Sequence, residues 1–151
     1  MKIICDTREK KNAHILRYFE RCGIDYIKKA LNVADYQIEG KPHIAIDRKQ
    51  NLQELSSNLT NKKDSSRFWK EVRRAREQHI KMIVLCEHSP SIKSIPDVAK
   101  WHSRYTTVSG RALMEAIYRV HISYGVEFLF CSKKQTGRRI IELLEQGNVE
   151  R

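Results

Sequence analysis

Two aspartates and a lysine in the first third of the sequence have the types and spacing needed for metal-assisted hydrolysis. Asp35 is followed, after eleven residues, by Asp47-Arg48-Lys49 at the end of the apolar run 43–46. Successive side chains of a strand point to opposite faces, so Asp47 and Lys49 project together while Arg48 points away. A hairpin that brings Asp35 beside Asp47 would offer a hard divalent cation two carboxylates, with an ammonium close to the attacking water.

The composition points to a polyanionic partner. The 151 residues include 29 Lys and Arg against 18 Asp and Glu, a formal net charge of +11. This excess is typical of proteins that bind nucleic acid, and we expect contacts with phosphates that are sensitive to salt and insensitive to base sequence. Any single basic pair could still be plain solubilising surface. The basic clusters are Lys10-Lys11, Lys28-Lys29, Lys62-Lys63, Arg73-Arg74-Ala75-Arg76, Lys133-Lys134 and Arg138-Arg139.

Composition also excludes several classes of protein. With 40% hydrophobic residues the chain is expected to fold as one domain over residues 1–151. No apolar run approaches the ~20 residues of a membrane span, and the N-terminus lacks the apolar stretch of a signal peptide. We therefore expect a cytoplasmic protein of a bacterium or of a virus in its host cell, or a nuclear protein in a eukaryote. The four cysteines lack zinc-ligand spacing and are expected to be reduced.

Hydrophobic periodicity predicts the elements that must position the acids. A β-meander should follow the first helix, and the alternation of strands and helices after residue 50 indicates that part of the sheet is parallel and covered on both faces. Residues 58–66 should be a loop, and residues 88–108 irregular. Strands are predicted at 2–6, 25–31, 33–38, 43–49, 81–87 and 126–131. Helices are predicted at 11–22, 52–59, from Ser65 or Ser66 to about Gln78, at 109–124 between Ser109 as cap and Gly125 as stop, and at 134–146.

Four segments together resemble one family. The acid-x-lysine spacing is that of the PD-(D/E)xK metal nucleases, and the order of the four segments is similar to the nuclease domain of the XPF/Hef type, structure-specific endonucleases that cut branched DNA. The similarity runs over nearly the whole chain. Residues 4–9 (Ile-Cys-Asp-Thr-Arg-Glu) resemble the V-D-x-R-E opening, 34–36 (Ala-Asp-Tyr) the G-D-Y, 47–49 (Asp-Arg-Lys) the E-R-K, and 67–68 (Arg-Phe) a frequent Arg-Phe pair.

The resemblance implies a three-layer α/β/α, restriction-endonuclease-like fold with a central mixed sheet. It further implies a requirement for Mg²⁺ or Mn²⁺, branched DNA as partner, commonly a homodimer, and a place in DNA repair or recombination. Carried over by position, Asp35 and Asp47 are the central metal ligands, Asp6 is a further ligand, Glu9 adds another acid, and Lys49 is the catalytic lysine. The residues expected to bind nucleic acid are Arg8, Arg48, Arg67, Lys70 and Arg74.

This sequence departs from the family pattern at several places. Ala34 replaces the glycine of G-D-Y, which predicts that the backbone there does not need a positive φ. Asp47 replaces a longer glutamate, and because related metal nucleases accept either acid we expect activity to survive. The acid that usually follows E-R-K is represented only by Gln53 or Glu54. The helix-hairpin-helix module that often follows such domains is not within residues 1–151, which leaves the preferred DNA structure open.

Other interpretations remain open. Asp35 could cap a turn, Asp47 and Lys49 could form an ion pair at a strand edge, and Glu9 could interact with a helix N-terminus. The main alternative function is a non-catalytic DNA-binding module that uses the nuclease fold as a platform or dimer partner. RNA binding ranks lower, because the spacing of Tyr18, Tyr26 and Trp101 does not predict a stacking platform.

Overall fold

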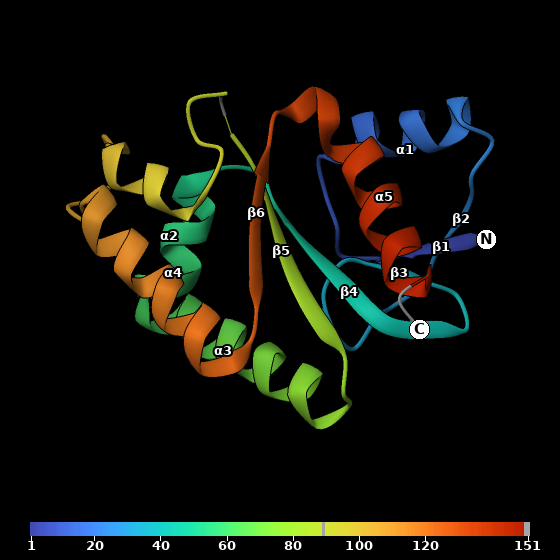
Figure 1. Cartoon of the computed structure of the whole chain (residues 1–151), viewed down its shortest axis with the longest axis horizontal. Helices are drawn as coiled ribbons and strands as arrows, with labels where there is room; N and C mark the ends of the chain where they lie inside the picture. The colour runs from blue at the N-terminus through green and yellow to red at the C-terminus, as the bar shows by residue number, and fades with distance from the viewer. Residues whose placement is uncertain (89, 150–151) are drawn as a thin grey trace.

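The computed structural model describes residues 1–88 and 90–149, and these form a mixed sheet between two layers of helices (Figure 1). The strands are β1 (Lys2–Cys5), β2 (Asp25–Lys28), β3 (Tyr36–Ile38), β4 (Lys41–Lys49), β5 (Lys81–Glu87) and β6 (Glu127–Cys131). The α-helices are α1 (Ala13–Arg21), α2 (Leu52–Thr60), α3 (Lys62–Glu77), α4 (Gly110–Tyr124) and α5 (Thr136–Val149), and the short 3₁₀ helices are η1 (Ile95–Lys100) and η2 (Lys133–Gln135). This is the three-layer α/β arrangement that the sequence predicts.

The topology brings the ends of several strands to one edge of the sheet. The order is β2-β1-β3-β4-β5-β6, and only β3 runs antiparallel to its neighbours. The carboxyl ends of β1, β4 and β5 therefore lie at the same edge, together with the start of β3. Asp6, Asp35, Lys49 and Glu87 all belong to this edge, which is where open α/β sheets commonly bind ligands.

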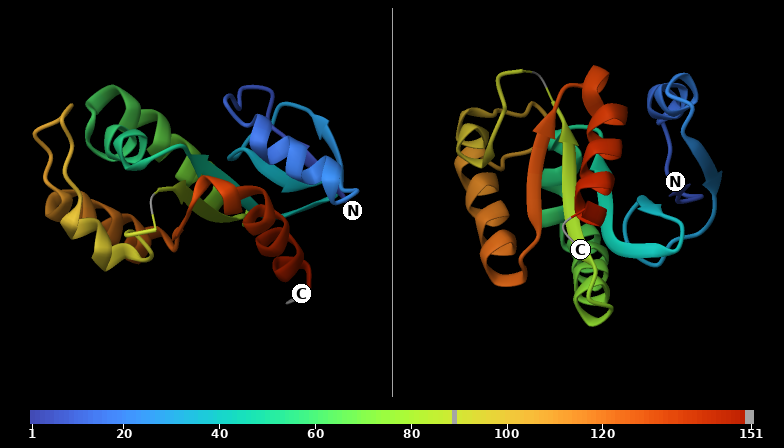
Figure 2. Two further views of the ribbon diagram at one scale, coloured as in Figure 1. Left: turned by 90° about the horizontal axis from the view of Figure 1, so that it is seen from above. Right: turned by 45° about the vertical axis from the view of Figure 1, so that its right-hand side comes forward.

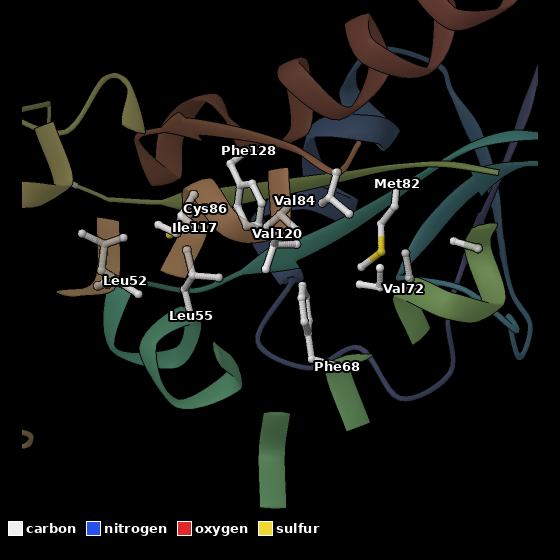
Figure 3. Packing of buried hydrophobic residues seen from close by; sticks show 14 of the residues in the cluster. Leu52, Leu55, Phe68, Val72, Met82, Val84, Cys86, Ile117, Val120 and Phe128 are labelled. Atoms are coloured by element: carbon white, nitrogen blue, oxygen red, sulfur yellow. The ribbon is translucent and has the colours of Figure 1, made fainter. Parts of the chain in front are cut away.

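Side-chain alternation on the central strands divides the core into two halves. The first half lies under α2, α3 and α4 and contains Met82, Val84 and Cys86 of β5 (Figure 3). Ile83 and Leu85 point to the opposite face and pack under α1 and α5. The two views in Figure 2 show these helical layers on opposite sides of the sheet. The same alternation on β4 places Ala45 on the α2–α3 face and Ile46 on the α1–α5 face.

Three predicted elements are wrong in detail. The meander does not form: β2 pairs in parallel with β1, because α1 is a crossover between them, and residues 29–35 connect β2 to the β3–β4 hairpin without forming a strand. The predicted loop at 58–66 is mostly helical, because the side chain of Asn61 accepts hydrogen bonds from Lys63 N and Asp64 N and starts α3 there. Within the predicted irregular segment, residues 95–100 form η1.

The start of α4 packs closely on η1. A Cβ atom added at Gly110 would lie 2.4 Å from the carbonyl oxygen of Val98 and 2.5 Å from that of Trp101. Ser109 caps this helix by accepting a hydrogen bond from Ala112 N, and Gly125 ends it in the left-handed conformation, both as predicted.

The outer surface bears on two further expectations. Within residues 1–88 and 90–149, no helix is both long and apolar enough to cross a membrane. Among the side chains that the structure describes, the exposed large hydrophobic ones are Met1, Tyr105 and Ile122. Helix α4 buries Leu113 and Ile117 in its own core, so the apolar surface that the homodimer would use is limited there to Ile122, and the homodimer stays a prediction.

Candidate active site

The β3–β4 hairpin brings the two predicted central acids together. The amide of Asp35 donates to Ile46 O at 2.9 Å, and the carboxylate of Asp35 accepts a hydrogen bond from Arg48 N at 2.8 Å. Asp47 follows Ile46 on β4 with its side chain on the α2–α3 face, and Lys49 Nζ lies 3.0 Å from Asp47 Oδ2. The predicted alternation is therefore confirmed, with Asp47 and Lys49 on one face and Arg48 on the other.

The charges of this group are strongly coupled. Burial, the charge of Asp47 and the charge of Glu9 raise the pKa of Asp35 well above its ordinary value. Burial alone would lower the pKa of Lys49, but the carboxylates of Asp47 and Asp35 outweigh it and raise that pKa. Lys49 is thus held as an ammonium between two acids, and one lysine does not fully neutralise them.

The backbone before Asp35 is left-handed, which corrects the expectation for Ala34. Ala34 has φ 61°, although alanine disfavours this region. The tertiary structure imposes the conformation, because hydrogen bonds fix the chain on both sides: Ala34 N donates to Glu71 Oε1, and Asp35 O accepts from Asp6 N at 2.8 Å. The glycine of the family pattern would meet the same need without strain.

Glu71 of α3 is a third acid of the site that the sequence prediction missed. Its carboxylate accepts the Ala34 amide, and burial together with the charge of Asp47 raises its pKa to about 7. One signal in the sequence could have found it. Glu71 lies one turn from Arg67 and from Arg74 and directly follows Lys70, so it is an acid among basic residues of α3.

Asp6 is placed differently from the prediction that makes it a metal ligand. Its Oδ2 accepts from Arg8 Nε at 3.0 Å, and its Oδ1 accepts from Leu31 N at 2.8 Å. Although burial opposes ionisation, these hydrogen bonds lower the pKa of Asp6. The carboxylate therefore holds the loop before β3 in place, and in this arrangement its oxygens are occupied by the chain. Arg8 is 73% exposed, so its predicted contact with nucleic acid remains sterically open.

Glu9 and Arg48 form a buried ion pair at the same edge of the sheet. Arg48 Nε lies 3.0 Å from Glu9 Oε2, and Arg48 Nη1 lies 3.4 Å from Glu87 Oε1. Glu87 in turn lies 2.8 Å from His14 Nε2, and Tyr36 donates to Glu9 at 2.8 Å. The side chain of Arg48 is only 1% exposed. The structure thus does not support the predicted contact of Arg48 with nucleic acid, because this guanidinium is enclosed by acids of the protein itself.

The acids open into a groove of about 500 Å³ between the hairpin and α3. Asp35, Asp47 and Lys49 line its floor, and Glu54 and Glu71 also line the groove. The predicted nucleic-acid contacts Arg67, Lys70 and Arg74 are exposed and line the same groove, so α3 supplies a basic wall opposite an acidic floor. Arg74 also donates to Asn32 O at 2.6 Å, which anchors α3 to the loop before β3.

The donor set fits a hard cation with few protein ligands. The described part of the chain holds no group of three or more His, Cys, Asp or Glu side chains arranged to bind a metal ion. However, Asp47 Oδ2 is buried without a well-formed hydrogen bond from any described residue, although the Lys49 ammonium is within ion-pair distance. A buried carboxylate oxygen that lacks a well-formed hydrogen bond and lies beside a second acid suits Mg²⁺, which commonly takes one or two carboxylates and keeps several waters.

Comparison with solved structures agrees with the overall fold. XPF from Aeropyrum pernix matches with a TM-score of 0.73 at 19% identity, over 98% of this chain and 65% of that one. The same protein in complex with DNA matches with a TM-score of 0.71 at 20% identity, over 99% of this chain and 66% of that one. The chain thus spans slightly less than two thirds of these structures, and its fold is the restriction-endonuclease-like fold of the XPF nuclease domain.

Sequence comparison then identifies the family. Residues 5–144 match the ERCC4 domain, and the chain belongs to the ERCC4 domain family. This range contains every predicted site residue from Asp6 to Arg74. No curated protein matches the sequence.

Proposed function

We propose that this ERCC4 domain is a divalent-metal-dependent DNA endonuclease that hydrolyses phosphodiester bonds in branched DNA. The observation that carries the proposal is the pairing of Asp35 with Asp47 beside Lys49 in a groove with a basic wall. Two buried like charges destabilise the protein unless a cation joins them, so their retention favours a site that binds one. The complex of XPF from Aeropyrum pernix with DNA supports the choice of DNA as the polymer.

In the proposed reaction, Asp35 and Asp47 would hold Mg²⁺ or Mn²⁺. The bound ion would supply a more acidic water and neutralise charge that develops on the phosphate. Lys49, fixed as an ammonium by Asp47, would orient the attacking water and stabilise negative charge beside it. Glu71 would face the same charges from α3, and its raised pKa allows it to accept or release a proton near neutral pH.

The basic wall would position the substrate. Arg67, Lys70 and Arg74 project from successive turns of α3 along the groove, a spacing that suits consecutive phosphates of one strand. Such contacts fix the register of the backbone and read no bases. Selection among flaps, forks and Holliday junctions would then depend on the shape of the DNA.

A non-catalytic DNA-binding module is the second candidate. The placement of Asp6 and Glu9 favours it, because their carboxylates bond to Arg8 and Arg48 and leave two acids of the predicted set free for a metal. Such a module would keep the basic wall and bind DNA without cutting it. Cleavage therefore decides between the two candidates.

The test is cleavage of end-labelled flap, fork, Holliday-junction and linear DNA with Mg²⁺, Mn²⁺ or EDTA, mapped at nucleotide resolution. We expect metal-dependent cuts near the branch. Asp35→Asn and Lys49→Ala should each reduce the rate by roughly 10²–10⁴-fold while binding in EDTA persists. The matched control is Asp25→Asn, an exposed acid on the edge strand β2. Full-rate cleavage by either site variant would refute the assignment, and binding without cleavage by the unaltered chain would favour the non-catalytic module.

A further inference from the structure

A second cavity lies on the opposite face of the sheet from the groove that holds Asp35 and Asp47, here called the catalytic groove. It has a volume of about 790 Å³ and lies where α1 meets η2 and the start of α5. The two helices approach closely there: a Cβ atom added at Gly137 would lie 2.7 Å from the Cβ of Tyr18. Figures 1 and 2 show α1 and α5 on the same side of the sheet, away from α2 and α3. Nothing in the proposed reaction uses this cavity.

Four of the eight residues that line this cavity are arginine or lysine. Arg17 and Arg21 come from α1, Lys133 and Lys134 from η2, and all four side chains are exposed. The carboxylate that also lines it, Glu20, accepts a hydrogen bond from Tyr26 at 2.8 Å.

These cations are also free of acidic partners. Arg138 and Arg139 nearby both pair with Glu142. By contrast, no carboxylate of residues 1–88 and 90–149 lies within 4.0 Å of the charged nitrogens of the four lining cations. Arg21 lies over the ring of Tyr18, 5.7 Å from its centre, but this contact does not neutralise its charge. Four cations without acidic partners around one hollow favour an anionic occupant with several charges.

The cavity lies at the same edge of the sheet as the catalytic groove. His14 lines it and bonds through Glu87 and Arg48 to Glu9, which lines the groove. The loop that separates the two hollows, residues 7–12, is itself basic and carries Arg8, Lys10 and Lys11. Positive charge therefore runs from one face of the sheet to the other across this edge, a path that fits a phosphate backbone better than a short acidic peptide.

We propose that the cavity between α1 and α5 binds the phosphates of a second DNA arm while the strand to be cut lies in the catalytic groove. This inference rests on the proposed function and adds the part of the substrate that the catalytic groove does not reach. The two hollows face opposite sides of one sheet. Duplex DNA is stiff over ~150 bp, so a straight duplex cannot follow both faces, whereas a branched DNA can. Simultaneous contact with both hollows would thus select branched DNA.

The test compares binding of two charge-reversal variants. Arg17→Glu with Lys134→Glu alters the cavity. The control, Lys2→Glu with Lys41→Glu, changes net charge equally at the opposite edge of the sheet, where β1 and β4 begin. Binding of a fork and of a short linear duplex is measured by fluorescence anisotropy in EDTA over a range of salt. Thermal unfolding verifies that each variant is folded, which we expect because all four side chains are exposed.

The cavity variant should lose the fork contacts selectively. Loss of two phosphate contacts lowers the slope of log K against log salt by about 2 and reduces fork affinity about thirtyfold at 0.15 M salt. The cavity variant and the control variant should bind the short duplex with equal affinity. Equal fork affinity in both variants would overturn the second-arm site even if the unaltered chain cuts DNA. If the cavity variant loses affinity for a poly-glutamate probe but not for the fork, the second-arm site is also overturned, in favour of an acidic protein partner. If the unaltered chain binds neither DNA, the proposed function fails as well.

Discussion

The site brings several acidic side chains close together in the folded protein, and Glu71 is one of them. Asp35, Asp47 and Glu71 lie close enough for their charges to raise pKa values, and Lys49 is the cation between them. In the absence of a divalent ion this arrangement opposes folding at neutral pH. Functional sites often carry such a cost in stability, and neutral substitutions there commonly stabilise the protein at the expense of activity.

The pH dependence of stability should reveal Glu71. Its pKa in the folded protein, about 7, lies above the 4.5 of an ordinary glutamate. A raised pKa means that the stabilising contribution is complete below the unfolded value and is lost as pH rises through about 7. In EDTA, the free energy of unfolding of the unaltered protein should fall by roughly 2 kcal/mol between pH 5 and 8 because of Glu71. Glu71→Gln should abolish this decrease. Urea unfolding at both pH values measures this.

Glu77→Gln on the same helix is the matched control, because this acid is exposed. It should leave the pH profile as it is in the unaltered chain. If Glu71→Gln and Glu77→Gln behave alike, Glu71 does not titrate in the way described.

For individual residues, the sequence predicts the acids of the hairpin well and the contacts between distant segments of the chain poorly. Strand alternation is a local property, so the common face of Asp47 and Lys49 follows from their spacing. Glu71 comes to the site only when α3 packs on the sheet, and the left-handed φ of Ala34 results from that same contact. The burial of Arg48 depends on Glu9 and Glu87, each 39 residues away in the chain.

Among the elements, α3 should supply most of the DNA contact near the site. Lys70 is exposed on the groove side, whereas Arg73 on the same helix is exposed and does not line the groove. Lys70→Glu should lower the salt slope of DNA binding by about 1, because one phosphate contact is lost. Arg73→Glu changes charge equally and should leave the slope unchanged. Identical slopes for the two variants would mean that the net charge, and not the groove, governs binding.

The contact between α4 and η1 gives a stability prediction of unusual sign. Glycine to alanine within a helix ordinarily stabilises by roughly 0.5–1 kcal/mol. At Gly110 the added methyl group would meet the carbonyl oxygens of Val98 and Trp101, so Gly110→Ala should destabilise by about 1–3 kcal/mol. Thermal or urea unfolding checks this, and any increase in stability would show that η1 can shift freely.

Periodicity locates most elements but not the points where tertiary contacts decide their bounds. The buried runs of β5 and β6 and the capped helix α4 are nearly as predicted, because each has a strong local pattern. The start of α3 was missed because its polar first turn, Lys62 to Asp64, has the composition of a loop, and only the Asn61 cap marks it. The place of β2 beside β1 follows from the α1 crossover, which short-range patterns do not reveal.

For the whole molecule, metal removal should be visible in thermal stability. An ion that binds only the folded protein stabilises it by mass action, by about 2.7 kcal/mol at 100 times Kd, which corresponds to about 5–10 °C in Tm for this size. Scanning calorimetry with Mg²⁺ and with EDTA measures the shift. In EDTA, Asp35→Asn should have a higher Tm than the unaltered protein, and Mg²⁺ should change the Tm of this variant little. If Mg²⁺ raises the Tm of Asp35→Asn as much as that of the unaltered protein, the ion binds at another site.

The β3–β4 hairpin has a further consequence, for the order in which the protein assembles. Asp35, Asp47 and Lys49 belong to a continuous stretch of chain from residue 35 to 49, so they meet as soon as this hairpin closes, while solvent still screens their charges. Repulsion becomes costly only at the later step, when α2 and α3 dock and exclude water. We therefore expect the electrostatic barrier to folding to lie in this late compaction, where counterions would lower it, and the nascent hairpin to form unhindered.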